Sequence, residues 1–134
     1  MAADLTFADV AEGVRNTIAA YTQAVDDGRT DDVVATFCAD GGVDIPGLGT
    51  HEGHDALRGA YAAVAPQRPQ RHLVLNTLIT DWSDESASAT SDVVFLLQRK
   101  EGWSPLLVGR YHDVLHPAGD GTWRFHHRTA EFTT

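Results

Sequence analysis

The 134-residue sequence predicts one α+β domain, spanning residues 1–134, in which three N-terminal helices precede a meander of four long strands. In the first half, apolar residues recur at steps of three or four, which is the period of an amphipathic helix. In the second half, extended apolar runs alternate with turn-forming residues. Consecutive strands with short links pair antiparallel, which leaves the helices to cover one face of the sheet.

The first predicted helix extends from Ala8 to Asp27, and Gly28 follows it where a left-handed C-cap is usual. One face of this helix carries the larger apolar side chains, which are Val10, Val14, Ile18, Tyr21 and Val25. Such a stripe is typical of a helix that packs against a core. The segment therefore predicts a long helix lying on the sheet.

A short second helix is predicted to start at Thr30, whose hydroxyl offers an N-cap oxygen. It includes Val33, Val34 and Phe37, and the glycine pair 41–42 ends it. A brief strand is then expected at residues 43–45, followed by the glycine-rich loop PGLGTHEGH.

The third predicted helix, Asp55 to Val64, is stopped by Pro66 and Pro69. The turn signals SDES, KEGWS and PAGDG separate the strands that follow. These predicted strands are His72 to Trp82, Ala87 to Arg99, Pro105 to His116 and Thr122 to Phe132.

The strand that begins at His72 is apolar on both of its faces. Val74 and Leu78 have even numbers and share one face of the strand (one parity), whereas Leu73, Leu75 and Ile79 have odd numbers and share the other face. A strand with two apolar faces is usually covered on both sides. We therefore expect a homodimer or homotrimer formed through the sheet face that the helices leave open.

Composition excludes several classes of partner. The formal net charge is −9, and the basic residues form no run, so nucleic acid is not expected to bind. The single cysteine, Cys38, excludes an intramolecular disulfide and a thiolate zinc site, which favours a cytoplasmic location. The N-terminus does not have the pattern of a secretory signal, and the apolar runs are too short to predict a membrane span.

The candidate catalytic pair is Asp26, at the end of the first helix, and His72, at the start of the first long strand. An imidazole at the mouth of a pocket can remove a proton near neutral pH. A buried carboxylate on its other nitrogen would set the tautomer and stabilise the imidazolium. A carboxylate near a helix C-terminus also needs a compensating partner, because it opposes the helix dipole. The alternative to a catalytic role is, for Asp26, a solvated carboxylate at the helix end. For His72, it is a side chain that faces solvent.

Strand parity supplies candidate substrate-binding residues. Asn76 shares its parity with His72, and the later strands would present further side chains to the same pocket. The substrate-binding candidates are Tyr21, Asn76, Phe95, Tyr111 and His127. Core packing is the alternative for Tyr21, and a structural role is the alternative for Tyr111 and His127. Arg110 and Arg128 fall on the opposite parity, where they would pair with acids of another subunit or face solvent.

No metal or cofactor is predicted. His51 and His54 lie in the glycine-rich loop, and the adjacent His126 and His127 must point to opposite faces of a strand. Hydrolysis of an epoxide would need acids and an arginine around one water molecule. Asp113 and Arg110 have opposite parity, which disfavours that reaction.

The order of these elements resembles the SnoaL-like branch of the nuclear transport factor 2-like superfamily, which includes scytalone dehydratase, hexachlorocyclohexane dehydrochlorinase and ketosteroid isomerase. The resemblance rests on AYTQAVDDGRTDDVVATF, GTHEGHDALRGAY, RHLVLNTLI, GRYHD and TWRFHHR. It implies a cone in which a curved sheet and a long helix enclose an apolar pocket. It also implies that Asp26 and His72 match the Asp–His pair of the dehydratase and dehydrochlorinase. The second catalytic histidine of scytalone dehydratase has no counterpart in SDVVFLLQRK.

Two functions follow as expectations. The first is a cofactor-independent lyase or isomerase, similar to a dehydratase or cyclase, that acts on a small hydrophobic molecule. The second is a non-catalytic module of the same fold that binds a small molecule or assembles with a partner.

Overall fold

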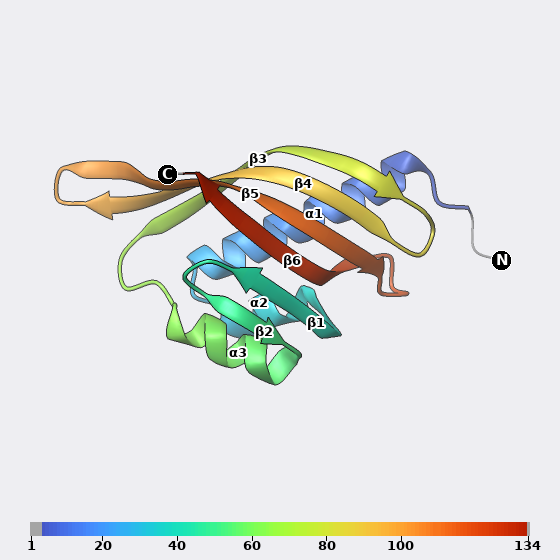
Figure 1. Ribbon diagram of the computed structural model, residues 1–134, viewed down its shortest axis with the longest axis horizontal. Helices are drawn as coiled ribbons and strands as arrows, with labels where there is room; N and C mark the ends of the chain where they lie inside the picture. The colour runs from blue at the N-terminus through green and yellow to red at the C-terminus, as the bar shows by residue number, and fades with distance from the viewer. Residues whose placement is uncertain (1–3, 134) are drawn as a thin grey trace.

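The structure is a computed structural model and describes residues 4–133. Its helices are α1 (Phe7–Asp26), α2 (Thr30–Ala35) and α3 (His54–Ala63). Its strands are β1 (Phe37–Ile45), β2 (Gly49–Glu52), β3 (Gln70–Trp82), β4 (Ala87–Arg99), β5 (Gly102–Pro117) and β6 (Trp123–Thr133). Figure 1 shows the strands as one curved sheet, with the β4–β5 hairpin projecting beyond the helices.

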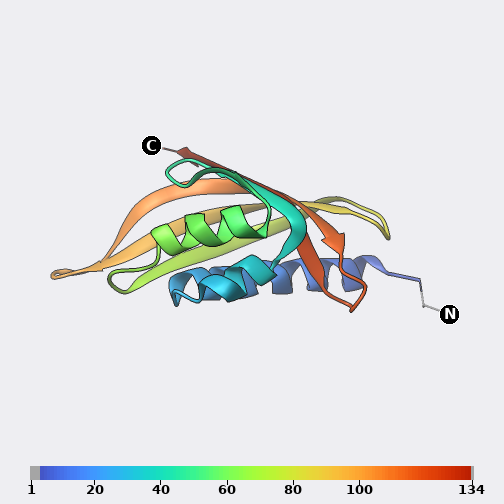
Figure 2. The same ribbon diagram turned by 90° about the horizontal axis from the view of Figure 1, so that it is seen from below.

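The predicted α+β fold is confirmed. The strands form one six-stranded sheet in the order β2-β1-β6-β5-β4-β3, which is curved but not closed. All three helices lie on its concave side (Figure 2). Strands β3 to β6 form the predicted antiparallel meander, whereas β1 pairs parallel with β6. None of the helices in the described part of the chain is long and apolar enough to cross a membrane.

Helix α1 begins and ends as its sequence dictates. The Thr6 side chain accepts a hydrogen bond from the Asp9 N–H, and the Asp9 carboxylate accepts one from the Thr6 N–H, which completes a capping box. Gly28 adopts the predicted left-handed conformation, with φ of 71°. The predicted apolar face packs into the core through Val10, Val14, Ile18 and Tyr21, with Val25 at its margin.

The second helix is shorter than predicted. It ends at Ala35, and Phe37 begins strand β1 instead of continuing the helix. Gly41 and Gly42 lie inside that strand and do not end a helix. Their lack of a side chain lets the neighbouring strands approach closely. A Cβ on Gly41 would lie 2.6 Å from the Phe125 carbonyl oxygen, and one on Gly42 would lie 3.0 Å from the His51 carbonyl oxygen. The expected glycine-rich loop also contains a strand, β2, which pairs with β1.

The sheet contains β-bulges that change which side chains face the helices. The register of β3 against β4 shifts between Leu75 and Leu78, and that of β6 against β5 shifts at His126. A bulge adds one residue to one strand, so the alternation of side chains is reversed beyond it. The parities predicted from simple alternation therefore fail after each bulge.

The convex face of the sheet, which we call the outer face, exposes several large apolar side chains. Leu73, Leu75 and Leu78 of β3 are between 43% and 61% exposed. On β5, Trp103 and Val108 are similarly exposed. This distribution agrees with a strand that is apolar on both sides, of which the helices cover only one.

Candidate active site

Asp26 and His72 meet at the concave side of the sheet. The His72 Nδ1 lies 2.6 Å from Asp26 Oδ1, and the His72 backbone N–H donates to Asp26 Oδ2 over 2.7 Å. These contacts join the last residue of α1 to the start of β3. The helix end thus places the carboxylate, and the strand places both groups that bind it.

The contacts identify the protonated nitrogen of the imidazole. An ionised carboxylate accepts hydrogen bonds and donates none, so in the neutral imidazole Nδ1 carries the proton. Nε2 then holds the free lone pair that a general base needs. The Asp26 side chain is 4% exposed and that of His72 is 21% exposed. The carboxylate is therefore sheltered, whereas the imidazole remains accessible.

Gln70 is a third partner of this pair and was missed by the sequence reasoning. Its Nε2 donates to Asp26 Oδ1 over 3.1 Å, and the residue is 8% exposed. Asp26 therefore accepts hydrogen bonds from three donors, which compensates for its unfavourable position at the C-terminus of a helix. Gln70 lies at the first position of β3, two residues before His72, where the same strand face carries both.

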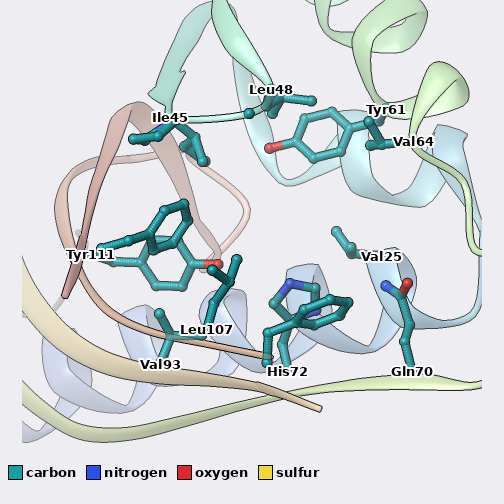
Figure 3. A pocket seen from close by; sticks show the side chains of 14 residues that line it. Val25, Ile45, Leu48, Tyr61, Val64, Gln70, His72, Val93, Leu107 and Tyr111 are labelled. Atoms are coloured by element: carbon teal, nitrogen blue, oxygen red, sulfur yellow. The ribbon is translucent and has the colours of Figure 1, made fainter. Parts of the chain in front are cut away.

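A cavity of about 320 Å³ opens beside His72. Its wall is mainly apolar, and its polar side chains are Tyr61, Gln70, His72 and Tyr111. In Figure 3, a ring nitrogen of His72 faces the cavity, and the hydroxyls of Tyr61 and Tyr111 point toward its middle. The apolar part of the wall is formed by Val25, Ile45, Pro46, Leu48, Val64, Val93, Phe95, Leu107 and Phe132.

Two of the predicted substrate-binding residues line this cavity, namely Phe95 and Tyr111. The Phe95 ring packs against the His72 ring with their centroids 4.6 Å apart. This contact restricts the movement of the imidazole. Tyr111 is 4% exposed, and its ring lies against the guanidinium of Arg128, as described below.

The other three candidates do not line the cavity. Tyr21 is buried in the core, where its hydroxyl lies 2.6 Å from that of Tyr61. Asn76 occupies the β3 bulge with φ of 56°, and its amide donates to Asp92 over 2.9 Å. Thr77 instead takes the position facing the helices, where it bonds to Ser91. His127 lies beyond the β6 bulge, beside Val114 on the outer face of the sheet.

The same β6 bulge brings Arg128 into the core, which corrects the expectation that it faces solvent or another subunit. Arg128 is fully buried, and it donates to Asp113 through Nε at 2.8 Å and Nη2 at 3.3 Å. Its guanidinium lies over the rings of Tyr111, Tyr21 and Phe125, at 3.6, 4.4 and 4.7 Å from their centroids. Its Nη1 is buried without a partner within residues 4–133. Arg110 remains on the outer face and pairs with Asp92 of its own chain.

Burial and the Asp113 carboxylate determine the protonation of these groups. Burial raises the pKa of Tyr111 and of Tyr61 well above the usual value for a phenol. Burial also disfavours the charged form of Arg128, but the Asp113 carboxylate outweighs it, so the pKa of Arg128 is raised. The tyrosines facing the cavity are thus neutral hydrogen-bond donors, and a permanent cation lies behind Tyr111.

His51, His54 and His112 have partners within the protein, whereas His126 stacks on His116 and its Nδ1 is buried without a hydrogen-bond partner within residues 4–133. His51 Nε2 lies 2.8 Å from the Leu48 carbonyl oxygen, and His54 Nε2 lies 3.0 Å from that of Phe37. His112 pairs with Glu131 on the outer face. Cys38 is partly buried, and burial raises the pKa of its thiol, which is the opposite of activation.

Several solved structures share this fold. The D26N form of Rv3472, a protein of unknown function from Mycobacterium tuberculosis, has a TM-score of 0.84 at 25% identity and covers 92% of this chain and 72% of its own. A protein from Novosphingobium aromaticivorans, provisionally named a scytalone dehydratase, has a TM-score of 0.80 at 21% identity. The match covers 93% of the present chain and 85% of that protein's chain. An NTF2-like protein with a cystatin-like fold from the same organism has a TM-score of 0.76 at 19% identity. The match covers 91% of the present chain and 80% of that protein's chain.

No curated protein matches the chain. The two Novosphingobium structures are distant enough in sequence to show the fold alone. The family model of the SnoaL-like domain, however, matches residues 8–129, which is nearly the whole chain. With the cavity and the order of its elements, this match shows that the protein belongs to the SnoaL-like family, within the NTF2-like fold.

Proposed function

We propose that this protein is a cofactor-independent lyase or isomerase that acts on a small, mostly apolar molecule. The observation that carries the proposal is the Asp26–His72 contact of 2.6 Å at the wall of an apolar cavity. The geometry required of a general base is a hydrogen bond to its orienting group and a free nitrogen toward the substrate. His72 has both.

In this proposal, Nε2 of His72 takes a proton from a carbon of the bound molecule. That carbon lies next to a carbonyl group or next to a carbon bearing a leaving group. The electron pair of the broken C–H bond moves to the carbonyl oxygen in the first case, or expels the leaving group in the second. An isomerase returns the proton from His72 to another carbon, whereas a dehydratase delivers it to the departing hydroxyl.

Asp26 stabilises the imidazolium that forms, since it lies in contact with the protonated Nδ1. Tyr111 supports the negative charge that develops on the substrate, because its hydroxyl points into the cavity and remains protonated. The Arg128 cation, 3.6 Å from the Tyr111 ring centroid, favours this charge further. A positioned base contributes roughly 10²–10⁴-fold, so such donors must supply much of the rest.

A second candidate is a non-catalytic module that binds a small molecule. It is favoured by the wall of the cavity, most of whose residues are apolar and would hold a hydrophobic ligand without any reaction. In that case His72 and Asp26 would serve to connect α1 to the sheet. The two candidates differ in what the loss of the imidazole does.

The test uses 2-tetralone, a bicyclic ketone with exchangeable protons next to its carbonyl group. Wild-type protein is expected to accelerate deuterium incorporation from D₂O, and His72→Ala is expected to lower that rate roughly 10²–10⁴-fold while affinity changes little. His112→Ala is the matched control, since His112 is also paired with an acid but lies on the outer face. Binding without accelerated exchange in the wild type would favour the second candidate.

A further inference from the structure

Gln70 has a fixed orientation, because only one end of its amide can face Asp26. The carboxylate accepts hydrogen bonds, so the Gln70 Nε2 must be the atom that approaches Asp26 Oδ1, at 3.1 Å. The carbonyl oxygen Oε1 is therefore turned away from the carboxylate. The neutral amide cannot rotate to exchange the two ends without placing two acceptors in contact.

The Oε1 of Gln70 is left as a free acceptor at the cavity. The hydrogen bonds within residues 4–133 include none to this oxygen, and it is not among the buried atoms sealed off without a partner. Gln70 is itself a wall residue of the cavity, beside Val25 and on the same side as His72 (Figure 3). An acceptor in this position is available to a bound molecule.

Gln70 and His72 each carry an acceptor that is not bound to Asp26. Both Gln70 Nε2 and His72 Nδ1 bind the same oxygen of Asp26, so the amide and the imidazole are held a few ångströms apart. His72 presents the lone pair of Nε2, and Gln70 presents Oε1. The other polar wall groups, the hydroxyls of Tyr61 and Tyr111, can donate as well as accept.

We propose that Gln70 Oε1 accepts a hydrogen bond from a hydroxyl or N–H group of the bound molecule, and that this residue selects ligands bearing such a donor near the carbon from which His72 takes a proton. The ligand class is then a small apolar ring system with a hydroxyl or N–H substituent. The proposal rests on the proposed function, because it assigns ligand chemistry to the same cavity.

The physical basis is the cost of an unpaired acceptor. A ligand with a methyl group in place of the hydroxyl removes water from Oε1 and returns no hydrogen bond. Discrimination of roughly 3–10-fold is the range that one neutral hydrogen bond supplies. Gln70 therefore acts on specificity, whereas the imidazole acts on the reaction.

The experiment compares the dissociation constants of 2-naphthol and 2-methylnaphthalene, which are similar in size and differ in the donor. Wild-type protein is expected to prefer 2-naphthol roughly 3–10-fold, and Gln70→Met, with a side chain of similar length, is expected to lose most of that preference. An unchanged preference in Gln70→Met would overturn the proposal, as would the absence of binding of either probe to the wild type.

A further control separates loss of the acceptor from disturbance of Asp26. The Nδ1–H signal of His72 in NMR spectra reports whether the Asp26 contact survives in Gln70→Met. Tyr111→Phe tests a rival explanation, since it removes a hydroxyl that also points into the cavity. If Tyr111→Phe abolishes the preference and Gln70→Met does not, the selecting residue is Tyr111. The outcome does not depend on deuterium exchange, so either proposal can fail alone.

Discussion

Asp26 binds His72 through both its side chain and its backbone, so one carboxylate determines where the imidazole lies and how it is turned. Oδ1 takes the side-chain contact at 2.6 Å and Oδ2 takes the backbone N–H at 2.7 Å. The two residues are 46 positions apart in the sequence. The contact therefore links α1 to β3 in addition to orienting the candidate base.

Asp26→Asn is expected to leave the fold intact and to disturb the imidazole. The amide oxygen can still accept the backbone N–H of His72, but its NH₂ group would then face Nδ1 and favour the other tautomer. We expect loss of the Nδ1–H signal of His72 in NMR spectra and a fall of roughly 10²–10⁴-fold in any exchange that the wild type catalyses. Asp27→Asn is the matched control, because the Asp27 carboxylate pairs with exposed Arg29 and with no other residue of the described range 4–133. Equal effects in both variants would contradict this role.

The buried pair of Arg128 and Asp113 gives a stability prediction. Arg128→Met removes the cation and leaves the carboxylate uncompensated in the core, at an expected cost of about 3–5 kcal/mol in the free energy of unfolding. The double variant Arg128→Met with Asp113→Leu removes both charges and is expected to recover most of that loss. Urea unfolding of the single and double variants measures the difference. A double variant no more stable than the single would show that the packing on Tyr111 matters more than the charge.

The sequence predicts the elements of this fold well, because their signals are local. The apolar stripe of α1, its glycine cap and the turn residues between strands each act within a few positions. The Asp26–His72 contact is long-range, but Asp26 lies at the end of a predicted helix and His72 at the start of a predicted strand. The family resemblance then predicts that the two residues form a pair. Phe37 was placed wrongly in a helix because its strand is held by pairing with Phe125, a partner 88 positions away that no local pattern reveals.

The bulges explain why the rest of the site could not be predicted. Alternation places Asn76 and His127 toward the helices and Arg128 away from them, and each assignment is reversed by one extra residue. The β3 bulge has a faint local signal, since Asn tolerates the left-handed conformation better than most residues. The β6 bulge has no such local signal in its sequence, which is HHR at residues 126–128. Gln70 was missed because its partner, Asp26, lies on another element.

Gly41 is predicted to be required for the approach of β1 to β6. Gly41→Ala would place a Cβ 2.6 Å from the Phe125 carbonyl oxygen, which is backbone and cannot turn aside. We expect a loss of about 1–3 kcal/mol in the free energy of unfolding, as for other overpacked sites. Gly59→Ala, in α3 with open space around it, is expected to stabilise the protein by about 0.5–1 kcal/mol. Thermal unfolding of both variants measures the contrast, and effects of the same sign would contradict it.

The expected homo-oligomer remains a prediction, and the outer face suggests how a second copy would fit. Asp84 and Glu85 lie at the β3–β4 turn, whereas Arg99 ends β4 and is followed by Lys100 and Glu101 at the β4–β5 turn. The net charge is therefore negative at one end of β4 and positive at the other. Two copies packed face to face about a two-fold axis would bring each basic end to the partner's acidic end, with the exposed leucines between them.

Light scattering after gel filtration tests this arrangement. Leu78→Glu, at a side chain 61% exposed on the outer face, is expected to produce monomers, whereas Leu5→Glu, before α1, is expected to have no effect. Reversing Arg99 and Lys100 to Glu should weaken association, and reversing Asp84 and Glu85 to Lys in the same chain should restore it. A wild-type protein that is monomeric at high concentration would rule out the second copy.

The tyrosines give a prediction at alkaline pH. The chain contains three, Tyr21, Tyr61 and Tyr111, and burial raises the pKa of each in the folded protein. In the unfolded chain a phenol ionises at a pKa of about 10, so the folded state holds more protons above that pH. The stability that the buried phenols contribute is therefore complete below about pH 10 and is lost as the pH rises further. We expect no phenolate absorbance in the native protein near pH 10, and then a single rise that coincides with the loss of circular dichroism. A gradual rise in folded protein would show that at least one of the three hydroxyls ionises more easily than its burial implies.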